Sequence, residues 1–293
     1  MRLPDMLAAT RRGARWALWP ALLLAVAYGG GCRRIEEPPA SGPATRPGAT
    51  RSATSRAVAS PPPRLVPTVR WDPAEAYLCR RAKGPITIDR ADHRRQWQDA
   101  VVIDRFLEPR TLRPATSRTE ARLLWDDRCL YIKVFAHDTD LRAKYTRRTD
   151  PLWEDDVVDM FFKPTAAKPS YYQFQITPIN TVGAYEVPRS DPRPSRQRMS
   201  DWPHGIRSAV YAYGTVNDPA KQDGYYRAVM AIPWKNLRLL GGKAPKTGDT
   251  WRFSICRYDY WDYPTSPEEY TSAPLKTNDF HRTQDYTVLK FVD

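Results

Sequence analysis

The chain has 293 residues, enough for one large β domain or two ordinary domains, and a net charge of +13. The charge is uneven: residues 1–70 carry 11 Arg against three acids, and the rest of the chain carries 35 cations against 30 acids. Because the excess lies mainly in the first 70 residues, the composition argues against a basic domain that binds nucleic acid.

Residues 1–31 have the features of an export signal. Four arginines precede the apolar run Trp16–Tyr28, which is shorter than the roughly 20 residues that a membrane span needs. Three glycines and Cys32 then resemble a bacterial lipoprotein signal, in which Cys32 becomes lipidated, although Gly29 stands where an aliphatic residue is usual. Cleavage after Ala25-Val26-Ala27 by ordinary signal peptidase is the alternative. We therefore expect an exported protein, either a lipoprotein of the periplasm or outer membrane, anchored to the membrane at Cys32, or a secreted protein.

Residues 32–70 are predicted to be a disordered linker. They consist mostly of Pro, Ala, Ser, Thr and Arg, with almost no large apolar side chains. Such a segment cannot bury enough surface to offset the entropy of ordering, and its prolines keep it semi-extended. It would act as a tether for a folded domain at residues 71–293.

Short strands are predicted throughout residues 71–293. In Leu130–His137 aliphatic side chains alternate with polar and aromatic ones, which is typical of a strand with one buried face. The other predicted strands are Pro85–Asp89, Arg122–Trp125, Val157–Lys163, Tyr171–Thr177, Gly183–Val187, Ser208–Val216, Tyr225–Ile232, Thr250–Tyr258 and Tyr286–Val292. Only Ala91–Trp97 and Pro233–Leu239 look helical. About ten short strands separated by turns predict an all-β fold, an antiparallel β-sandwich of the immunoglobulin or jelly-roll kind.

Several large or reactive side chains are assigned to the scaffold. If Cys32 is lipidated, three cysteines remain, so either one disulfide forms or the thiols are simply buried. These cysteines are Cys79, Cys129 and Cys256. Four tryptophans are assigned to packing, namely Trp97, Trp125, Trp234 and Trp251, and His281 to a structural hydrogen bond.

The segment Pro151–Phe162 carries the clearest functional signal. Trp153 and three acids lead into an apolar strand that contains one more acid, Asp159. Carboxylates accept hydrogen bonds from hydroxyl groups, and an indole face covers the apolar face of a sugar ring. The segment therefore predicts a site for a neutral, hydroxyl-rich ligand.

Six segments, in order, resemble the family 9 carbohydrate-binding modules and their bacterial relatives among the DOMON-type sandwiches. The closest matches are L-L-W-D-D-R-C-L-Y-I-K-V at 123–134 and L-W-E-D-D-V-V-D-M-F-F at 152–162. The others are P-I-T-I-D with Trp97, Y-Y-Q-F-Q-I-T-P-I-N at 171–180, A-I-P-W-K-N-L at 231–237 and G-D-T-W-R-F-S-I-C-R at 248–257. The resemblance covers residues 74–293 and implies the β-sandwich of that family.

For function, the resemblance implies non-catalytic sugar binding between two tryptophans, with carboxylate and amide side chains on the hydroxyl groups. Trp153 and Asp159 match one tryptophan and the acid, where Glu is more usual. Gln173 and Gln175 lie near the positions of further polar contacts.

The family's second tryptophan and its metal ligands have less direct counterparts in this sequence. Trp261 is our candidate for the second aromatic platform, with Tyr260 and Tyr263 as alternatives. A structural role is favoured for Asp155 and Asp156, either capping a turn or holding calcium, which the resemblance suggests because family members often carry this ion. No other cofactor is expected.

The sequence also bears on three other classes of function. A glycosidase needs two carboxylates that flank the bond, whereas the acids at 154–156 come from one strand end, and neither G-x-S-x-G nor H-E-x-x-H occurs. We therefore expect no enzymatic activity.

A haem-b electron-transfer module of the DOMON kind remains an alternative, with Met160, Met199, Met230 and His137 as the available ligands. A structural surface module with a decayed site is the last alternative. The preferred hypothesis is a carbohydrate-binding module at the cell envelope that assists carbohydrate catabolism.

Overall fold

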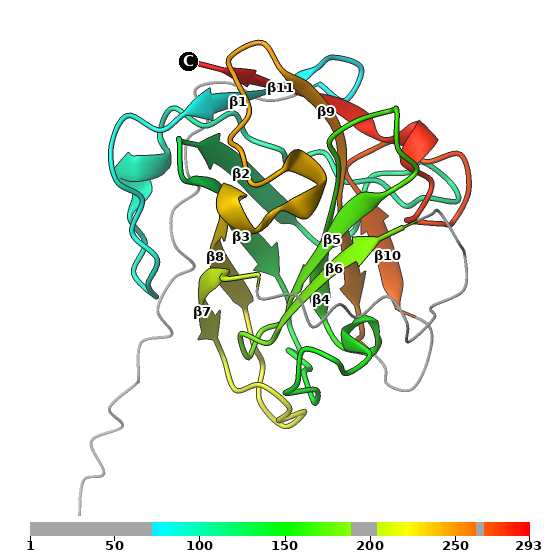
Figure 1. Cartoon of the computed structure of the whole chain (residues 1–293). Coiled ribbons are helices and arrows are strands. Elements are labelled where there is room, and N and C mark those ends of the chain that lie inside the picture. Colours follow the sequence, from blue (N-terminus) through cyan, green and yellow to red (C-terminus); the bar gives the residue numbers. More distant parts are fainter. Residues whose placement is uncertain (1–71, 189–203, 262–266) are drawn as a thin grey trace, which may run out of the picture. The chain divides into compact units, whose positions relative to one another are not determined.

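The computed structural model describes residues 72–188, 204–261 and 267–293 (Figure 1). The predicted export signal, Cys32, the linker, Met199 and Tyr263 lie outside the described residues. The strands are β1 (Tyr77–Arg81), β2 (Thr119–Trp125), β3 (Cys129–His137), β4 (Val157–Lys163), β5 (Tyr171–Ile176), β6 (Val182–Val187), β7 (Arg207–Tyr213), β8 (Tyr225–Pro233), β9 (Thr250–Asp259), β10 (Glu268–Thr271) and β11 (Thr287–Val292). The helical elements are short 3-10 turns: η1 (Arg94–Trp97), η2 (Leu152–Glu154), η4 (Trp234–Asn236), η5 (Arg238–Leu240) and η6 (Thr283–Asp285).

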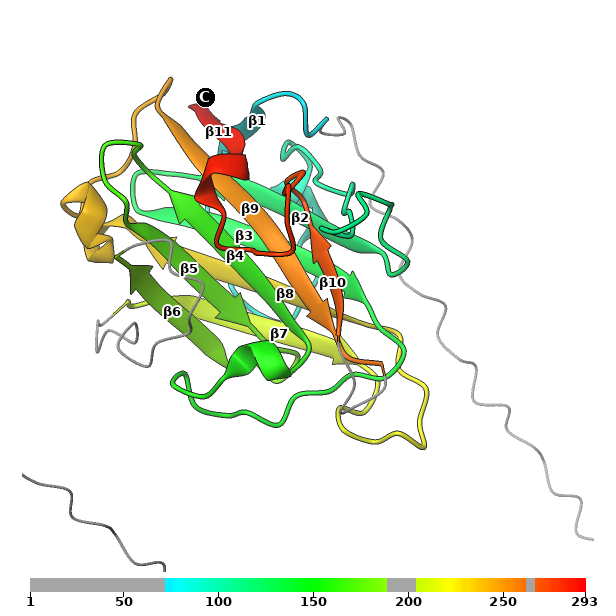
Figure 2. The ribbon, with the colours of Figure 1, turned by 90° about the vertical axis from the view of Figure 1, so that its right-hand side faces the viewer.

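The strands form one hydrogen-bonded sheet that folds over on itself. Its order is β6-β5-β4-β9-β11-β1-β2-β3-β8-β7, and β10 pairs with β9. The layer that contains β5, β4 and β9 lies over the layer that contains β3 and β8 (Figure 2). The predicted all-β sandwich is confirmed. Two pairings in the described part are parallel, however: β1 runs parallel to both β11 and β2.

The core lies between the two layers and follows from the two-residue period of the strands. On β4, Val158, Met160 and Phe162 point into this core, which places Asp159 and Phe161 on the outward face. The packing role predicted for the four tryptophans is confirmed, because each is at most 5% exposed. A smaller apolar cluster that includes Phe161, Tyr171 and Tyr286 covers part of the outward face of β4 and β5.

The structure corrects some predicted elements. Pro85–Asp89 is not a strand: the backbone N–H of Thr87 donates to the Gln96 side chain (2.9 Å) rather than to a neighbouring strand. The two predicted helices are only 3-10 turns, and β1 and β10 were not predicted. Cys79, Cys129 and Cys256 are buried and form no disulfide with one another, which agrees with the interpretation that they are buried thiols.

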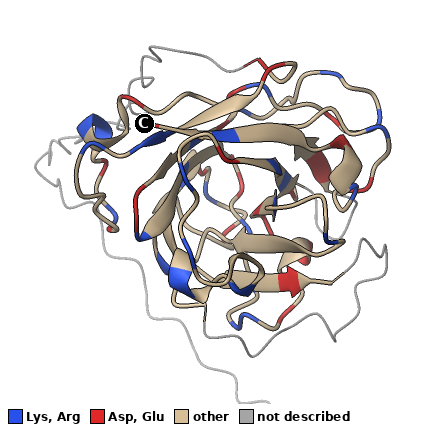
Figure 3. Ribbon diagram, turned by 45° about the horizontal axis from the view of Figure 1, so that its top comes forward, with Lys and Arg blue, Asp and Glu red and all other residues tan. Residues whose placement is uncertain are grey.

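Cationic and acidic residues are interspersed along the ribbon of the described part (Figure 3). Within the same residues, no helix is long and apolar enough to cross a membrane.

Candidate functional site

Three of the predicted site residues form a hydrogen-bonded polar trio on the outward face of β4 and β5. Asp159 lies opposite Gln175 in the register, and Gln173 is two residues away on the same face. Nε2 of Gln173 donates to Oδ2 of Asp159 (2.8 Å), and Nε2 of Gln175 donates to the same oxygen (3.1 Å). The pairing of β4 with β5 therefore brings together side chains that the sequence separates by up to 16 residues.

The polar trio (Asp159, Gln173 and Gln175) is buried and incompletely paired. Asp159 is 2% exposed, and this burial raises its pKa to about 7, while the two amide donors oppose the rise by stabilising the carboxylate. Oδ1 of Asp159 and Oε1 of Gln175 are buried without a hydrogen-bond donor in the described part. A buried acceptor without a donor costs about 1–3 kcal/mol. The trio thus holds two buried acceptors that have no donor among the described residues.

Gly183 and Tyr185 on β6 shape the space beside the polar trio. Gly183 lies opposite Gln175, and a Cβ atom at this position would come within 2.8 Å of both Gln175 Oε1 and the Tyr185 hydroxyl. Tyr185 donates its hydroxyl hydrogen bond to the carbonyl of Arg148 (3.0 Å). Neither residue was predicted. A glycine inside a strand often marks the close approach of other groups, so Gly183 could have been recognised from the sequence.

An aromatic group lies where the start of β4 meets the end of β9. Trp153 is in η2, immediately before β4, and Tyr260 and Trp261 follow β9, which pairs with β4. The Tyr260 hydroxyl donates to the carbonyl of Trp153 (2.9 Å). Trp153 is half-buried, whereas Trp261 is 60% exposed, the highest value among the large apolar side chains described. Burial raises the pKa of Tyr260 to about 12. The aromatic group (Trp153, Tyr260 and Trp261) therefore joins the segment before β4 to the segment after β9, both of which were predicted to carry aromatic site residues.

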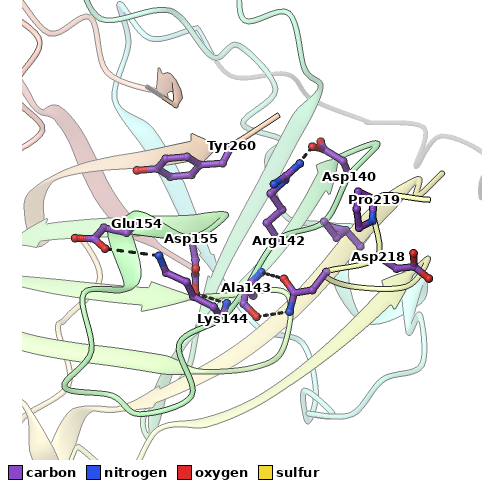
Figure 4. Close-up of a pocket in the computed structure, with 11 residues that line it drawn as sticks. Asp140, Arg142, Ala143, Lys144, Glu154, Asp155, Asp218, Pro219 and Tyr260 are labelled. Carbon is purple, nitrogen blue, oxygen red and sulfur yellow. Dashed lines mark hydrogen bonds and ion pairs between the residues drawn. The ribbon is translucent and has the colours of Figure 1, made fainter. Parts of the chain in front are cut away.

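A pocket of about 160 Å³ adjoins the aromatic group. Figure 4 shows Tyr260 across this pocket from Lys144, with Arg142 on a further side. Nε of Arg142 pairs with Asp140 (3.1 Å), and Nζ of Lys144 lies 3.9 Å from Oε2 of Glu154. The lining residues are Asp140, Leu141, Arg142, Ala143, Lys144, Glu154, Asp155, Asn217, Asp218, Pro219 and Tyr260.

Asp155 and Asp156 hold the backbone around this pocket. Oδ2 of Asp155 accepts the backbone N–H groups of Lys144 (2.9 Å) and Tyr145 (2.8 Å). Asp156 accepts the backbone N–H of Arg142 at Oδ2 (2.6 Å) and that of Tyr260 at Oδ1 (2.7 Å). These contacts support the favoured interpretation that both acids are structural.

The donor set around Asp156 does not fit calcium well. Asp138, Asp156 and Asp259 are buried with one carboxylate oxygen each within 4.8 Å of the others, but calcium takes 6–8 oxygen ligands. The fully buried guanidinium of Arg257 supplies positive charge instead, because its Nη2 lies 2.9 Å from both Asp138 Oδ2 and Asp259 Oδ2. Calcium at Asp155 and Asp156 stays a prediction.

The remaining candidate residues are structural in their contacts. Nδ1 of His281 is hydrogen-bonded to the Tyr171 hydroxyl (2.6 Å), as expected. Met160 and Met230 are buried in the core between the layers, whereas His137 is exposed on the outward face. His137 therefore faces away from the space that holds the two methionines.

Comparisons with protein families and solved structures find proteins that are similar to this chain. The family model described as "Carbohydrate family 9 binding domain-like" matches residues 90–293. A proposed carbohydrate-binding protein from Bacteroides uniformis is 14% identical, with a TM-score of 0.58 over 74% of this chain and 99% of that one. A family 9 carbohydrate-binding module from Caldicellulosiruptor kristjanssonii, solved with cellotriose, is also 14% identical, with a TM-score of 0.48 over 73% of this chain and 93% of that one. No curated protein matches the sequence.

Proposed function

Because the chain belongs to the carbohydrate family 9 binding domain-like family, we propose that it is a non-catalytic carbohydrate-binding module. The ligand is a sugar or the end of a polysaccharide. Trp153 and Trp261 provide the aromatic surfaces. Tyr260 links them, because it precedes Trp261 in the chain and its hydroxyl donates to the Trp153 carbonyl. Asp159, Gln173 and Gln175 provide the polar contacts.

The observation that carries this proposal is the hydrogen bond between Tyr260 and the carbonyl of Trp153 (2.9 Å). It joins two aromatic residues from distant parts of the chain, next to a tryptophan that is 60% exposed. An exposed indole leaves apolar surface in water, at a cost of roughly 25 cal/mol per Å². The apolar face of a sugar ring covers such a surface, while its hydroxyl groups remain available for acceptors such as Asp159.

The test is a glycan array followed by calorimetry on the wild type and Trp153→Ala. We expect the variant to lose glycan binding and keep its thermal unfolding temperature, since Trp153 is only half-buried. Tyr211→Ala is the matched control, because Tyr211 is a 37% exposed aromatic on β7, in the other layer. Equal binding by the wild type and Trp153→Ala would show that the site assignment is wrong.

We also propose that the module is displayed at the cell envelope through a lipid on Cys32, which follows the apolar run and three glycines. The Pro-rich linker then separates the module from the membrane. In this position it assists carbohydrate catabolism by holding glycans near other envelope proteins.

A further inference from the structure

The pocket lined by Tyr260 is a concave space beside the aromatic group, separate from the polar trio. Its volume, about 160 Å³, is well below the roughly 300–1,000 Å³ of common small-molecule pockets. It therefore suits one sugar unit and is too small for a chain. Its walls come from segments 140–144 and 217–219, from η2 and from the end of β9.

The walls of the pocket are held in place by hydrogen bonds with three side chains, of which Asp155 and Asp156 are buried. The carboxylates of Asp155 and Asp156 accept the backbone N–H groups of three wall residues, Arg142, Lys144 and Tyr260. Asn217 exchanges two hydrogen bonds with the backbone of Ala143, at 2.9 and 2.8 Å. A site whose shape is set before the ligand arrives loses less entropy on binding. The pocket is thus preorganised.

The pocket is directly connected to Trp153. Glu154, which lines the pocket, is the next residue in the chain, and the Tyr260 hydroxyl donates to the Trp153 carbonyl. We propose that this pocket is a second sugar subsite, which takes one neutral pyranose unit next to the unit that Trp153 contacts. This inference rests on the proposed function and makes the ligand at least a disaccharide.

The chemistry of the lining selects a neutral sugar. Hydroxyl groups both donate and accept, and the pocket offers the donors Arg142 and Lys144 together with carboxylate acceptors. Acids nevertheless outnumber cations, four to two, among its lining residues. A uronate would add a negative charge to this acidic surface, so repulsion disfavours it.

The test is an array that carries neutral and uronate oligosaccharides of one to four units. We expect the wild type to bind neutral glycans of two or more units more strongly than single sugars or uronates. Arg142→Ala should weaken the binding of the longer neutral glycans by about three- to tenfold, the loss of one or two hydrogen bonds, and leave single sugars unchanged. The Arg142 backbone, which Asp156 holds, is kept in this variant. Arg95→Ala, at an exposed position in η1, is the control.

A second variant tests the charge argument. Glu154→Gln removes one negative charge from the pocket and should raise the binding of uronate oligosaccharides relative to neutral ones. If both variants bind every glycan as the wild type does, while Trp153→Ala does not bind, the second subsite is wrong and the proposed function stands. If the wild type binds no glycan on the array, both fail. Equal binding of uronate and neutral glycans by the wild type would overturn the charge argument.

Discussion

Asp159 combines deep burial in the fold with a proposed role in binding. Its carboxyl is buried beside two amide donors, and one of its oxygens lacks a hydrogen-bond donor in the described part. Burial raises its pKa from 3.8 to about 7. The carboxylate that we propose as an acceptor of sugar hydroxyls is therefore kept in an environment that disfavours its charge.

This raised pKa predicts a pH dependence of stability. The unfolded chain loses the Asp159 proton near pH 4 and the folded protein near pH 7, so the folded state binds more protons in between. The free energy of unfolding should then fall as the pH rises from about 4 to about 7, by at most about 1.4 kcal/mol per pH unit for this group. Asp159→Asn should make the fall shallower. Denaturant unfolding at one-unit pH steps measures both slopes, and identical slopes would contradict the assignment.

The family resemblance named the members of the polar trio, and strand alternation explains why they share one face. Gln173, Gln175 and Asp159 follow from that rule once β4 and β5 pair. The contact of Tyr260 with Trp153 could not be predicted in the same way. It depends on how the ends of β4 and β9 meet, and the two residues lie 107 positions apart. The role of Asp156 in holding Tyr260 was hidden for the same reason.

At the scale of elements, β9 carries a charge into the core. Trp251, Phe253 and Ile255 point inward, and the same two-residue period places Arg257 on that face. There its guanidinium lies between Asp138, just after β3, and Asp259, at the end of β9. This buried cluster connects the two layers at one end of the core. An arginine on the inward face of an apolar strand indicates a buried ion pair, so this cluster could have been predicted from the sequence.

Arg257→Met should destabilise the fold strongly, because it leaves buried carboxylates without their partner. The expected loss is about 3–5 kcal/mol in the free energy of unfolding. Arg252→Met is the matched control on the same strand, since Arg252 is exposed and makes one hydrogen bond, to the Tyr286 carbonyl. It should cost only about 1 kcal/mol. Adding Asp138→Asn and Asp259→Asn to Arg257→Met should recover part of the loss. Equal effects of the two arginine variants would mean that the cluster is not stabilising.

Strong alternation made most strands predictable, and weak alternation or missing partners explain the errors. The predicted β3, β4, β5, β8 and β9 agree with the structure to within a few residues. β1 was missed because its segment, Y-L-C-R-R, has only two inward side chains, Tyr77 and Cys79. In contrast, Pro85–Asp89 alternates but finds no partner strand, and Ile86 packs against Trp97 and its neighbours instead.

At the scale of the whole molecule, the two layers are joined through the pairing of the first and last strands. β1 lies between β11 and β2 and runs parallel to both. Such a non-local pairing has no signature in the local pattern, because it depends on segments more than 200 positions apart. The fold class was therefore predictable from the number and spacing of strands, whereas the pairing of β1 with β11, which joins the two layers, was not.

The attachment of the whole protein is predicted to depend on Cys32. A lipid on this cysteine would place the native protein in the membrane fraction, with a mature N-terminus that carries the lipid mass. Cys32→Ser should move the protein to the soluble fraction and leave glycan binding unchanged, since the proposed site lies on β4, β5 and the end of β9. Fractionation and mass spectrometry of the mature N-terminus measure both effects. A soluble wild type that begins just after Ala27 would instead establish cleavage by ordinary signal peptidase.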